Sequence, residues 1–437
     1  MKNKSIVNNS IWAISQQLFS LILSFAIGVI TVRYLGAEKY GVIGIANAIT
    51  LIVFSFSWLG IDSVIVNEII VSGNKEFDVV WTVLITKFIT SFFSIFIAAA
   101  VGFFSNDNAE IFVIIVILSG LAMFLQSYEI FSYWFQSKLL IKYVAIAVLI
   151  SQTSSSIIQI IFILFHKSLI YFAIIPVIQN ALLFSILFIS FKSISKSKIT
   201  FNIGILKKIL KKSFNYVISS IAITLYMQID KVMIGKMISD SESGVYNVAV
   251  NLALYWQIIP ISIINSMRPV ILYFKKEKDE KYLDYLKVLV FVVSVISFVI
   301  CIILCLFSSQ IINFLYGENF EGAVIPFIIT VWATFVAMIG VIRGIWLIAE
   351  GLDRYDKYFT IAAAIINIIL NIFLIRFMGI IGAALATLIS YFVEVFVVNL
   401  LFKRTQYFDF IFLSSFFNLK NKLSICKTML KERKLLK

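Results

Sequence analysis

The chain has one histidine, three cysteines and four prolines in 437 residues, and only 14% of its residues are charged. Neither an HExxH motif nor a Cys/His cluster is present, so no zinc site is expected. Cys301 and Cys305 lie one turn apart in an apolar stretch and Cys426 is distant, which predicts three free thiols. The lone His166 is interpreted as a polar cap at a helix end, with a proton-relay role as the alternative. No GxxxxGK[ST] sequence occurs, which excludes ATP hydrolysis at a P-loop.

Apolar residues dominate what remains: they make up 61% of the chain, and the mean hydropathy is +1.00. Soluble proteins have about 45–50% apolar and about 25% charged residues. About twelve apolar stretches approach the length of about 20 residues that spans a bilayer. Backbone groups in hydrocarbon must be satisfied within their own segment, which favours helices, and the strict alternation of barrel strands is absent. The sequence predicts an all-α integral membrane protein with spans 10–32, 41–66, 79–103, 111–134, 144–166, 169–191, 214–238, 245–270, 284–307, 323–349, 358–377 and 380–402.

The positions of the 37 Lys and Arg residues predict the orientation of these spans. When the N-terminus is placed inside, most basic residues fall in the inner connections and in the C-terminal tail. The positive-inside rule therefore predicts that both termini are cytoplasmic. The formal net charge of +14 then reflects topology and contact with anionic lipid. Nucleic acid is not an expected partner, because the basic residues are spread over several connections.

The longest charged connection between spans is 192–213 (KSISKSKITFNIGILKKILKKS). In its second part, apolar and Lys residues alternate at helical spacing, which predicts an amphipathic helix in the inner headgroup layer. The apolar members are Ile205, Leu206, Ile209 and Leu210. We expect four parts: an N-terminal six-helix half (1–191), a basic cytoplasmic linker (192–213), a C-terminal six-helix half (214–402) and a basic cytoplasmic tail (403–437).

The two halves show a weak internal repeat. At a constant offset of 203 residues, Ser10 falls on Ser213, Gly41 on Gly244, Val42 on Val245 and Ala46 on Ala249. Toward the end of each half the offset becomes 215, where Lys142-Tyr143 falls on Lys357-Tyr358. Six spans per half is an even number, so both halves start inside and the repeat is parallel. In secondary transporters with such repeats, substrates bind between the halves.

The charged residues within spans are the main candidates for function. Each costs about 2.5–3.5 kcal/mol at a helix centre, so each is expected to face protein or water. Lys87 lies eight residues into its predicted span, about 12 Å deep at about 1.5 Å per residue. One interpretation is that these residues form structural pairs, such as Lys87 with Glu129.

In the other interpretation, basic residues line a polar cavity that attracts an anionic headgroup, for which Arg offers a bidentate grip on phosphate. These cavity residues are Lys87, Lys231, Arg268 and Arg343. Acidic residues in the spans then serve as counter-charges or as sites for a coupling H⁺ or Na⁺. The acidic residues are Asp62, Asp230, Glu129 and Glu394.

Three segments resemble bacterial polysaccharide exporters. They are Val32–Gly41 (VRYLGAEKYG), Tyr226–Asp240 (YMQIDKVMIGKMISD) with the following Ser243–Tyr246 (SGVY), and Glu350–Tyr358 (EGLDRYDKY). With the order and length of the helices, they make the chain similar to the Wzx-type O-antigen and polysaccharide repeat-unit flippases. That family belongs to the multidrug/oligosaccharidyl-lipid/polysaccharide exporter superfamily.

The resemblance implies transport of an undecaprenyl-pyrophosphate-linked oligosaccharide from the inner to the outer leaflet of the bacterial plasma membrane. It also implies alternating access around a cationic cavity, with an H⁺ or Na⁺ gradient as the driving force and no bound cofactor. By position, only Asp230 and Lys231 match the Asp-basic pair of the family. The implied partners are the lipid-linked oligosaccharide, membrane lipids, a polysaccharide polymerase and a chain-length regulator.

Other functions stay open from the sequence. A drug/cation antiporter of the same superfamily would favour an acidic, aromatic cavity, and a lipid II-type flippase is closer still. A scaffold without transport activity would need no buried charges. A membrane-embedded glycosyltransferase would need carboxylates or cations on a substantial loop, whereas the longest outer connection is only 308–322. The chain is therefore not expected to be an enzyme.

Overall fold

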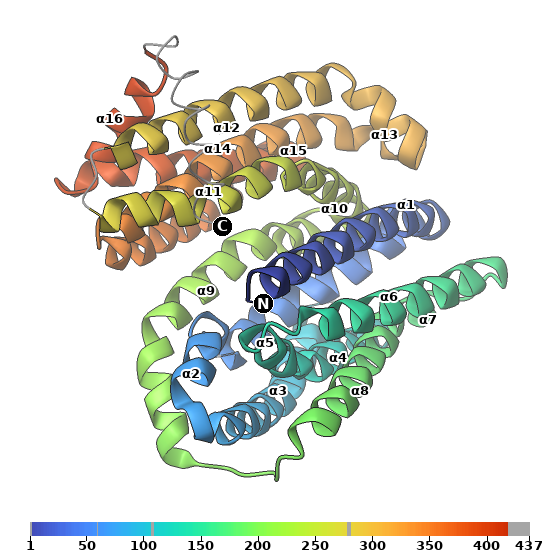
Figure 1. Cartoon of the computed structure of the whole chain (residues 1–437). Helices are drawn as coiled ribbons and strands as arrows, with labels where there is room; N and C mark the ends of the chain where they lie inside the picture. Colours follow the sequence, from blue (N-terminus) through green and yellow to red (C-terminus); the bar gives the residue numbers. More distant parts are fainter. Residues whose placement is uncertain (1, 59, 106–108, 278–280, 418–437) are drawn as a thin grey trace. The chain divides into compact units, whose positions relative to one another are not determined.

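The computed structural model describes residues 2–58, 60–105, 109–277 and 281–417, and within these ranges the chain is helical without a β-strand (Figure 1). Ten helical stretches are long and apolar enough to cross a membrane. Two of them, Ile11–Ser57 and Asp353–Leu401, have 47 and 49 residues, enough for two crossings each. Counting these two twice gives twelve crossings. The prediction of an all-α, multi-pass membrane protein is confirmed.

Glycines divide the two long stretches. Helix α1 (Lys2–Ser57) is interrupted at Gly36, where φ is 72°, and helix α15 (Asp356–Phe392) at Gly379, where φ is 59°. Side chains other than glycine disfavour positive φ, so a helix turns at these positions at little cost. Both breaks fall in the short connections that the sequence predicts between adjacent spans.

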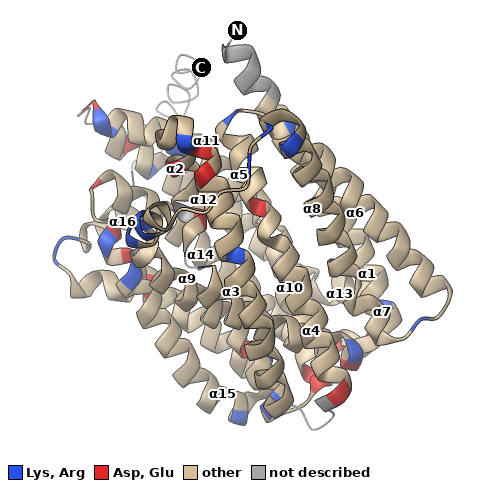
Figure 2. Cartoon of the chain, turned by 90° about the horizontal axis from the view of Figure 1, so that it is seen from below, with Lys and Arg blue, Asp and Glu red and all other residues tan. Residues whose placement is uncertain are grey.

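Charged residues are sparse along the middle of the long helices and gather near their ends (Figure 2). Packing divides the chain into two compact units, Met1–Gly244 and Val245–Lys437. The predicted halves, 1–191 and 214–402, differ from these units because helix α9 (Ile203–Met237) packs within the first unit. Those domain boundaries stay a prediction. Cys301 and Cys305 are free, as expected, whereas Cys426 and the end of the predicted tail lie outside the described residues.

The first unit is built around an aromatic core in which Trp81, Phe131, Trp134 and Phe191 are buried against one another. Its helices besides α1 are α2 (Ile65–Ser72), α3 (Glu76–Ser105), α4 (Ala109–Leu125), α5 (Glu129–Ser137), α6 (Ile141–Leu164), α7 (Leu169–Ala173), α8 (Ile175–Ser195) and α9 (Ile203–Met237), with single turns η1 (Ile61–Ser63), η2 (Gly73–Lys75) and η3 (Gln126–Tyr128).

The predicted amphipathic linker forms the first part of α9, which runs on as one bent helix (Figure 1). Asn202 caps it by accepting hydrogen bonds from the backbone N–H groups of Gly204 and Ile205. Ile209 is fully buried in the core of the first unit, and Ile205 packs against the same core. Part of the apolar stripe therefore packs on protein, and its contact with the inner headgroup layer stays a prediction.

The basic face of the same segment holds a buried carboxylate. Glu68 of α2 forms ion pairs with Lys208, at 3.0 Å, and with Lys212. The Glu68 side chain is 2% exposed, whereas both lysine side chains are about half-exposed. The two lysines thus fix the start of α9 to α2.

The second unit contains α10 (Asp240–Tyr255, which begins in the first unit), α11 (Ile258–Lys276), α12 (Lys281–Leu306), α13 (Ser308–Tyr316), α14 (Val324–Ala349), α15 and α16 (Tyr407–Ser414). Its shorter segments are η4 (Glu318–Ala323), η5 (Asp353–Tyr355), η6 (Val393–Val397) and η7 (Val398–Leu401). The predicted span 245–270 is divided between α10 and α11. The division precedes Pro260, whose missing N–H leaves the Trp256 carbonyl without its i+4 donor.

One local structure occurs in both units. Leu139 and Gly351, 212 residues apart, have φ of 57° and 67° at the ends of α5 and α14. The next residue in each case donates back to a carbonyl five residues earlier, Leu140 to Phe135 at 2.8 Å and Leu352 to Leu347 at 2.7 Å. Both helix ends are therefore closed by the same turn.

An ion pair stands beside each of these turns, with opposite polarity. Lys138 Nζ lies 2.5 Å from Glu76 Oε2 at the start of α3. At the position 212 residues later, Glu350 Oε1 lies 2.7 Å from Lys275 Nζ at the end of α11. We refer to these two ion pairs as the clasps.

Candidate functional site

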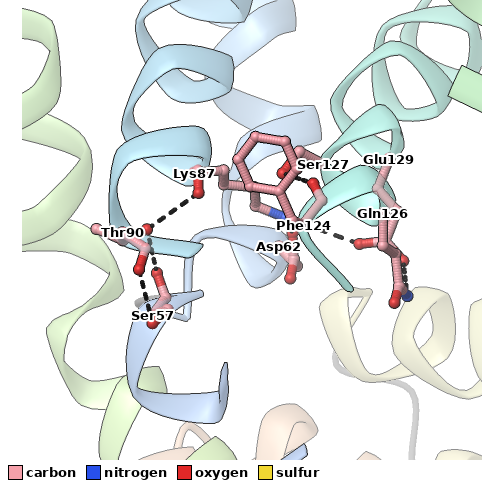
Figure 3. Close-up of polar contacts among 8 residues, drawn as sticks. All are labelled: Ser57, Asp62, Lys87, Thr90, Phe124, Gln126, Ser127 and Glu129. Carbon is pink, nitrogen blue, oxygen red and sulfur yellow. Dashed lines mark hydrogen bonds and ion pairs between the residues drawn. The ribbon is translucent and has the colours of Figure 1, made fainter. Parts of the chain in front are cut away.

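A buried lysine forms the first charged cluster, within the first unit. Lys87 Nζ lies 2.6 Å from Asp62 Oδ1 and 3.7 Å from Glu129 Oε2 (Figure 3). The Lys87 side chain is 2% exposed, whereas those of Asp62 and Glu129 are 31% and 27% exposed. The predicted pairing of Lys87 with Glu129 is present, and Asp62 is a closer partner.

Breaks in the helices bring the carboxylates to Lys87. Helix α1 ends at Ser57, and Gly60 adopts a φ of 58° before the single turn η1 that carries Asp62. A Cβ on Gly60 would lie 2.7 Å from the backbone N of Val217 in α9, so close packing also requires glycine here. Glu129 begins α5 and accepts a hydrogen bond from Gln126 Nε2 at 2.9 Å.

The Lys87 cluster has more negative than positive charge. One ammonium faces two carboxylates, which leaves a formal charge of −1. Removing the buried partner of such a cluster costs about 3–5 kcal/mol, because the remaining charge is uncompensated. The Lys87 ammonium is therefore held in the interior by both carboxylates, whereas the partly exposed Asp62 and Glu129 side chains carry the surplus negative charge.

A buried arginine forms the second cluster, within the second unit. The Arg343 guanidinium donates from Nη1 to the backbone carbonyl of Glu394, and Nη2 lies 3.6 Å from Glu394 Oε1. Nη2 also lies 3.7 Å from Asp356 Oδ1, and the guanidinium carbon stands 4.5 Å from the centre of the Phe359 ring. The side chain of Arg343 is 2% exposed. Carboxylates, a backbone carbonyl and an aromatic ring thus all contribute to stabilising the buried cation.

An unusual helix segment supplies the carbonyl group. Glu394 lies in η6, which is a π-helical turn. Such turns are rare, occur frequently at functional sites and break the regular i+4 hydrogen-bond ladder. The carbonyl of Glu394 is thus available to Arg343. The hydrogen bond between them connects α14 to η6, the segment that follows α15.

The two clusters have the same composition: one buried cation and two carboxylates. Asp356 was not predicted as a site residue, although it belongs to the segment EGLDRYDKY that carries part of the family resemblance. Within the described ranges, no three His, Cys, Asp or Glu side chains gather as metal ligands.

The other predicted site residues lie outside these clusters' ion pairs. Asp230 is buried toward the C-terminal end of α9, and the neighbouring Lys231 donates to Gln228 Oε1 at 3.1 Å. The backbone carbonyl of Lys231 accepts from Ser243 Oγ at 3.1 Å. Arg268 is exposed on α11, next to Pro269. Of the predicted cations, Arg268 alone combines exposure with a position inside a membrane-spanning stretch.

Two solved structures share the fold of this chain. The solved structure of the lipid II flippase MurJ in its inward closed conformation has a TM-score of 0.70 to this chain, with 18% identity over 97% of this chain and 92% of that one. The inward-facing conformation of a multidrug resistance MATE family transporter of the MOP superfamily has a TM-score of 0.69, with 13% identity over 94% and 96%. These likenesses show that this multi-pass, all-helical chain shares its fold with the two proteins over most of its length.

The sequence comparison narrows the class to a family. The family described as "Polysaccharide biosynthesis protein" matches residues 30–325, and the chain belongs to it. The probable low-salt glycan biosynthesis flippase Agl15 of Haloferax volcanii is 25% identical over 187 residues, which are 41% of this chain. The match spans only 39% of that relative's length.

Proposed function

We propose that the chain is a flippase for an undecaprenyl-pyrophosphate-linked oligosaccharide, the repeat unit of O-antigen or another surface polysaccharide. It moves this unit from the inner to the outer leaflet of the bacterial plasma membrane by alternating access. One observation carries the proposal: a member of a polysaccharide biosynthesis family has the fold of a lipid II flippase over 97% of its length. Sugars and pyrophosphate do not cross hydrocarbon unaided, because unpaired polar groups are costly there.

The charged clusters support a role in this transport. In the structure, the cations of both clusters, Lys87 and Arg343, are neutralised by carboxylates, so an incoming pyrophosphate must compete with them. Binding of H⁺ or Na⁺ to one carboxylate removes the surplus negative charge, so the cluster no longer repels an incoming pyrophosphate, which then competes with a single carboxylate for the cation. The H⁺ or Na⁺ gradient is then coupled to transport through the charge of each cluster, with Asp62 and Glu129 in one and Glu394 in the other.

The surplus of carboxylates also favours a second candidate function. Two accessible carboxylates around one buried cation suit a positively charged compound, and the fold is shared with a multidrug transporter. A drug/cation antiporter is therefore the alternative, and a lipid II-type flippase is the variant closest to the main proposal.

A strain deleted for this gene tests the function directly. We expect a complete undecaprenyl-linked repeat unit to accumulate and surface polysaccharide to disappear, and the trapped sugar then identifies the substrate. Accumulated lipid II would assign the lipid II-type variant. Normal surface polymer with increased sensitivity to cationic drugs would overturn the proposal in favour of the antiporter.

The cationic cavity has its own test. The variant Arg343→Glu would bury a third carboxylate beside those of Asp356 and Glu394, so it would test folding as much as transport. Arg268→Glu is the sharper variant because Arg268 is exposed, and Arg404→Glu, also exposed, is its matched control. We expect Arg268→Glu to abolish export at a normal protein level, whereas Arg404→Glu retains it. Full export by Arg268→Glu would contradict the role of Arg268.

A further inference from the structure

An apolar groove runs along the first unit between α1 and α3. It is an open depression with a volume of about 360 Å³. Its walls are Val53 and Phe56 from α1 and Phe93 and Ile97 from α3. Phe56, Phe93 and Ile97 are all more than half exposed. The groove lies within the apolar stretches that cross the membrane, so its surface is suited to hydrocarbon.

Small hydroxyl residues make the floor of the groove. The hydroxyls of Ser57 and Ser94 are hydrogen-bonded to each other, and both side chains are buried. Thr90 Oγ1 donates to the backbone carbonyl of Ser57 at 3.1 Å. These groups satisfy one another, so the floor holds the helices together and presents little polar surface to an occupant.

One end of the groove lies beside the Lys87 cluster. Thr90 follows Lys87 by three residues on α3, about 4.5 Å along the helix axis, and Thr90 Oγ1 lies 3.3 Å from the backbone carbonyl of Lys87 (Figure 3). Ser57 is the last residue of α1, five residues before Asp62. The end of the groove formed by Ser57 and Thr90 therefore lies close along the chain to Asp62 and Lys87 of the buried charged cluster.

We propose that this groove binds the isoprenoid chain of the lipid-linked substrate while the pyrophosphate head is at the Lys87 cluster; the proposal rests on the proposed function. The head and the first isoprene unit are covalently joined, so a head at the depth of Lys87 requires an apolar path that begins beside it. Lys87 lies eleven residues beyond the start of α3, about 16 Å along the helix. Ordinary phospholipids keep their headgroups at the membrane surface, and their polar ends do not reach this position.

Photo-crosslinking tests the groove in the full chain. The photoreactive residue p-benzoylphenylalanine is placed at Phe93 and, separately, at Phe56, and the protein is reconstituted in phosphatidylglycerol vesicles with a tritium-labelled polyprenyl pyrophosphate. The control is the same substitution at Phe92, which neighbours Phe93 on α3 and is similarly exposed, 51% against 61%, but does not line the groove. All three positions carry exposed aromatic side chains, so the substitutions are mild.

We expect the label at Phe93 and Phe56 to exceed that at Phe92 by about tenfold, a preference of about 1.4 kcal/mol. Unlabelled polyprenyl pyrophosphate should compete the label away, whereas added phosphatidylglycerol should not. Equal labelling at all three positions would show that the groove holds ordinary membrane lipid and would overturn the proposal. The accumulation of lipid-linked oligosaccharide in the deletion strain is read independently, so failure of the groove and failure of the flippase function are distinguishable.

Discussion

Gly41 and Gly244 lie backbone to backbone within the first unit. A Cβ on Gly41 would lie 1.8 Å from the carbonyl oxygen of Asp240, and a Cβ on Gly244 would lie 1.9 Å from that of Ala37. The two glycines are 203 residues apart, and so are Ala37 and Asp240. The contact is thus reciprocal between positions that the weak sequence repeat already pairs.

Alanine at either glycine should break this contact. We expect Gly41→Ala and Gly244→Ala to lower the free energy of unfolding by about 1–3 kcal/mol, because the added methyl groups overpack backbone that has no room to yield. Gly28→Ala is the control, since nothing lies within 4 Å of a Cβ at that helical position. Thermal unfolding of the detergent-solubilised protein measures the effect, and equal stability of Gly41→Ala and Gly28→Ala would contradict the tight contact.

Removal of the buried lysine should be severe. We expect Lys87→Met to destabilise the protein by about 3–5 kcal/mol, because Asp62 and Glu129 lose their common cation. Lys211→Met, at an exposed lysine on α9, is the control and should have little effect. Lys87→Arg keeps the charge and separates stability from transport: it should fold, and its export rate reports whether the ammonium group itself is needed. A Lys87→Met protein as stable as the control would show that the cluster does not hold the unit together.

The lysines around Glu68 should act non-additively. Lys208→Gln or Lys212→Gln alone leaves one cation on the buried carboxylate, so each should cost no more than about 1 kcal/mol. The double variant leaves Glu68 unpaired and should cost several times more than the two single losses together. Chemical denaturation of the four proteins measures the difference. Simple addition of the single effects would mean that Glu68 has another source of compensation.

The clasp of the second unit should tolerate a charge exchange. Glu350→Lys places like charges together and should destabilise the unit by about 1 kcal/mol, since both side chains are partly exposed. Lys275→Glu combined with Glu350→Lys restores opposite charges in the polarity that the first unit already uses. Recovery of most of the lost thermal stability in the double variant is the expected result. No recovery would indicate that the hydrogen bond from the Tyr282 hydroxyl to Glu350 dominates the interaction.

The sequence predicts the membrane-spanning architecture well because hydrocarbon imposes a length and a composition on every span. The breaks at Gly36 and Gly379 follow from the same pattern. The remaining differences between predicted spans and observed helices arise from backbone geometry, which hydropathy does not report. The predicted span 41–66 ends at Ser57 because Gly60 turns the chain, and the predicted span 245–270 divides before Pro260. The contact of the linker with the inner headgroup layer stays a prediction, because amphipathic periodicity reports an apolar face without identifying all that covers it.

The sequence also identifies most members of the two clusters, since a charge within an apolar stretch is conspicuous. It does not identify their partners. Asp62 and Lys87 meet only because η1 folds back beside α3. Asp356 stands among other charged residues at a helix start, where the sequence does not distinguish it from its neighbours. Burial could not be predicted either: Arg268 and Arg343 both lie toward the inner ends of their predicted spans, yet Arg268 is exposed and Arg343 is enclosed by Glu394 and Phe359.

The opposite polarity of the two clasps has a consequence for how the chain assembles. Two similar units synthesised one after the other risk exchanging equivalent segments while they fold. An exchange here would set Lys138 against Lys275 and Glu76 against Glu350, and both combinations repel. Each clasp therefore favours pairing of helix ends from the same unit over pairing of ends from different units. A chimera that joins two copies of the same unit would lose this preference, because the exchanged ion pairs would then attract.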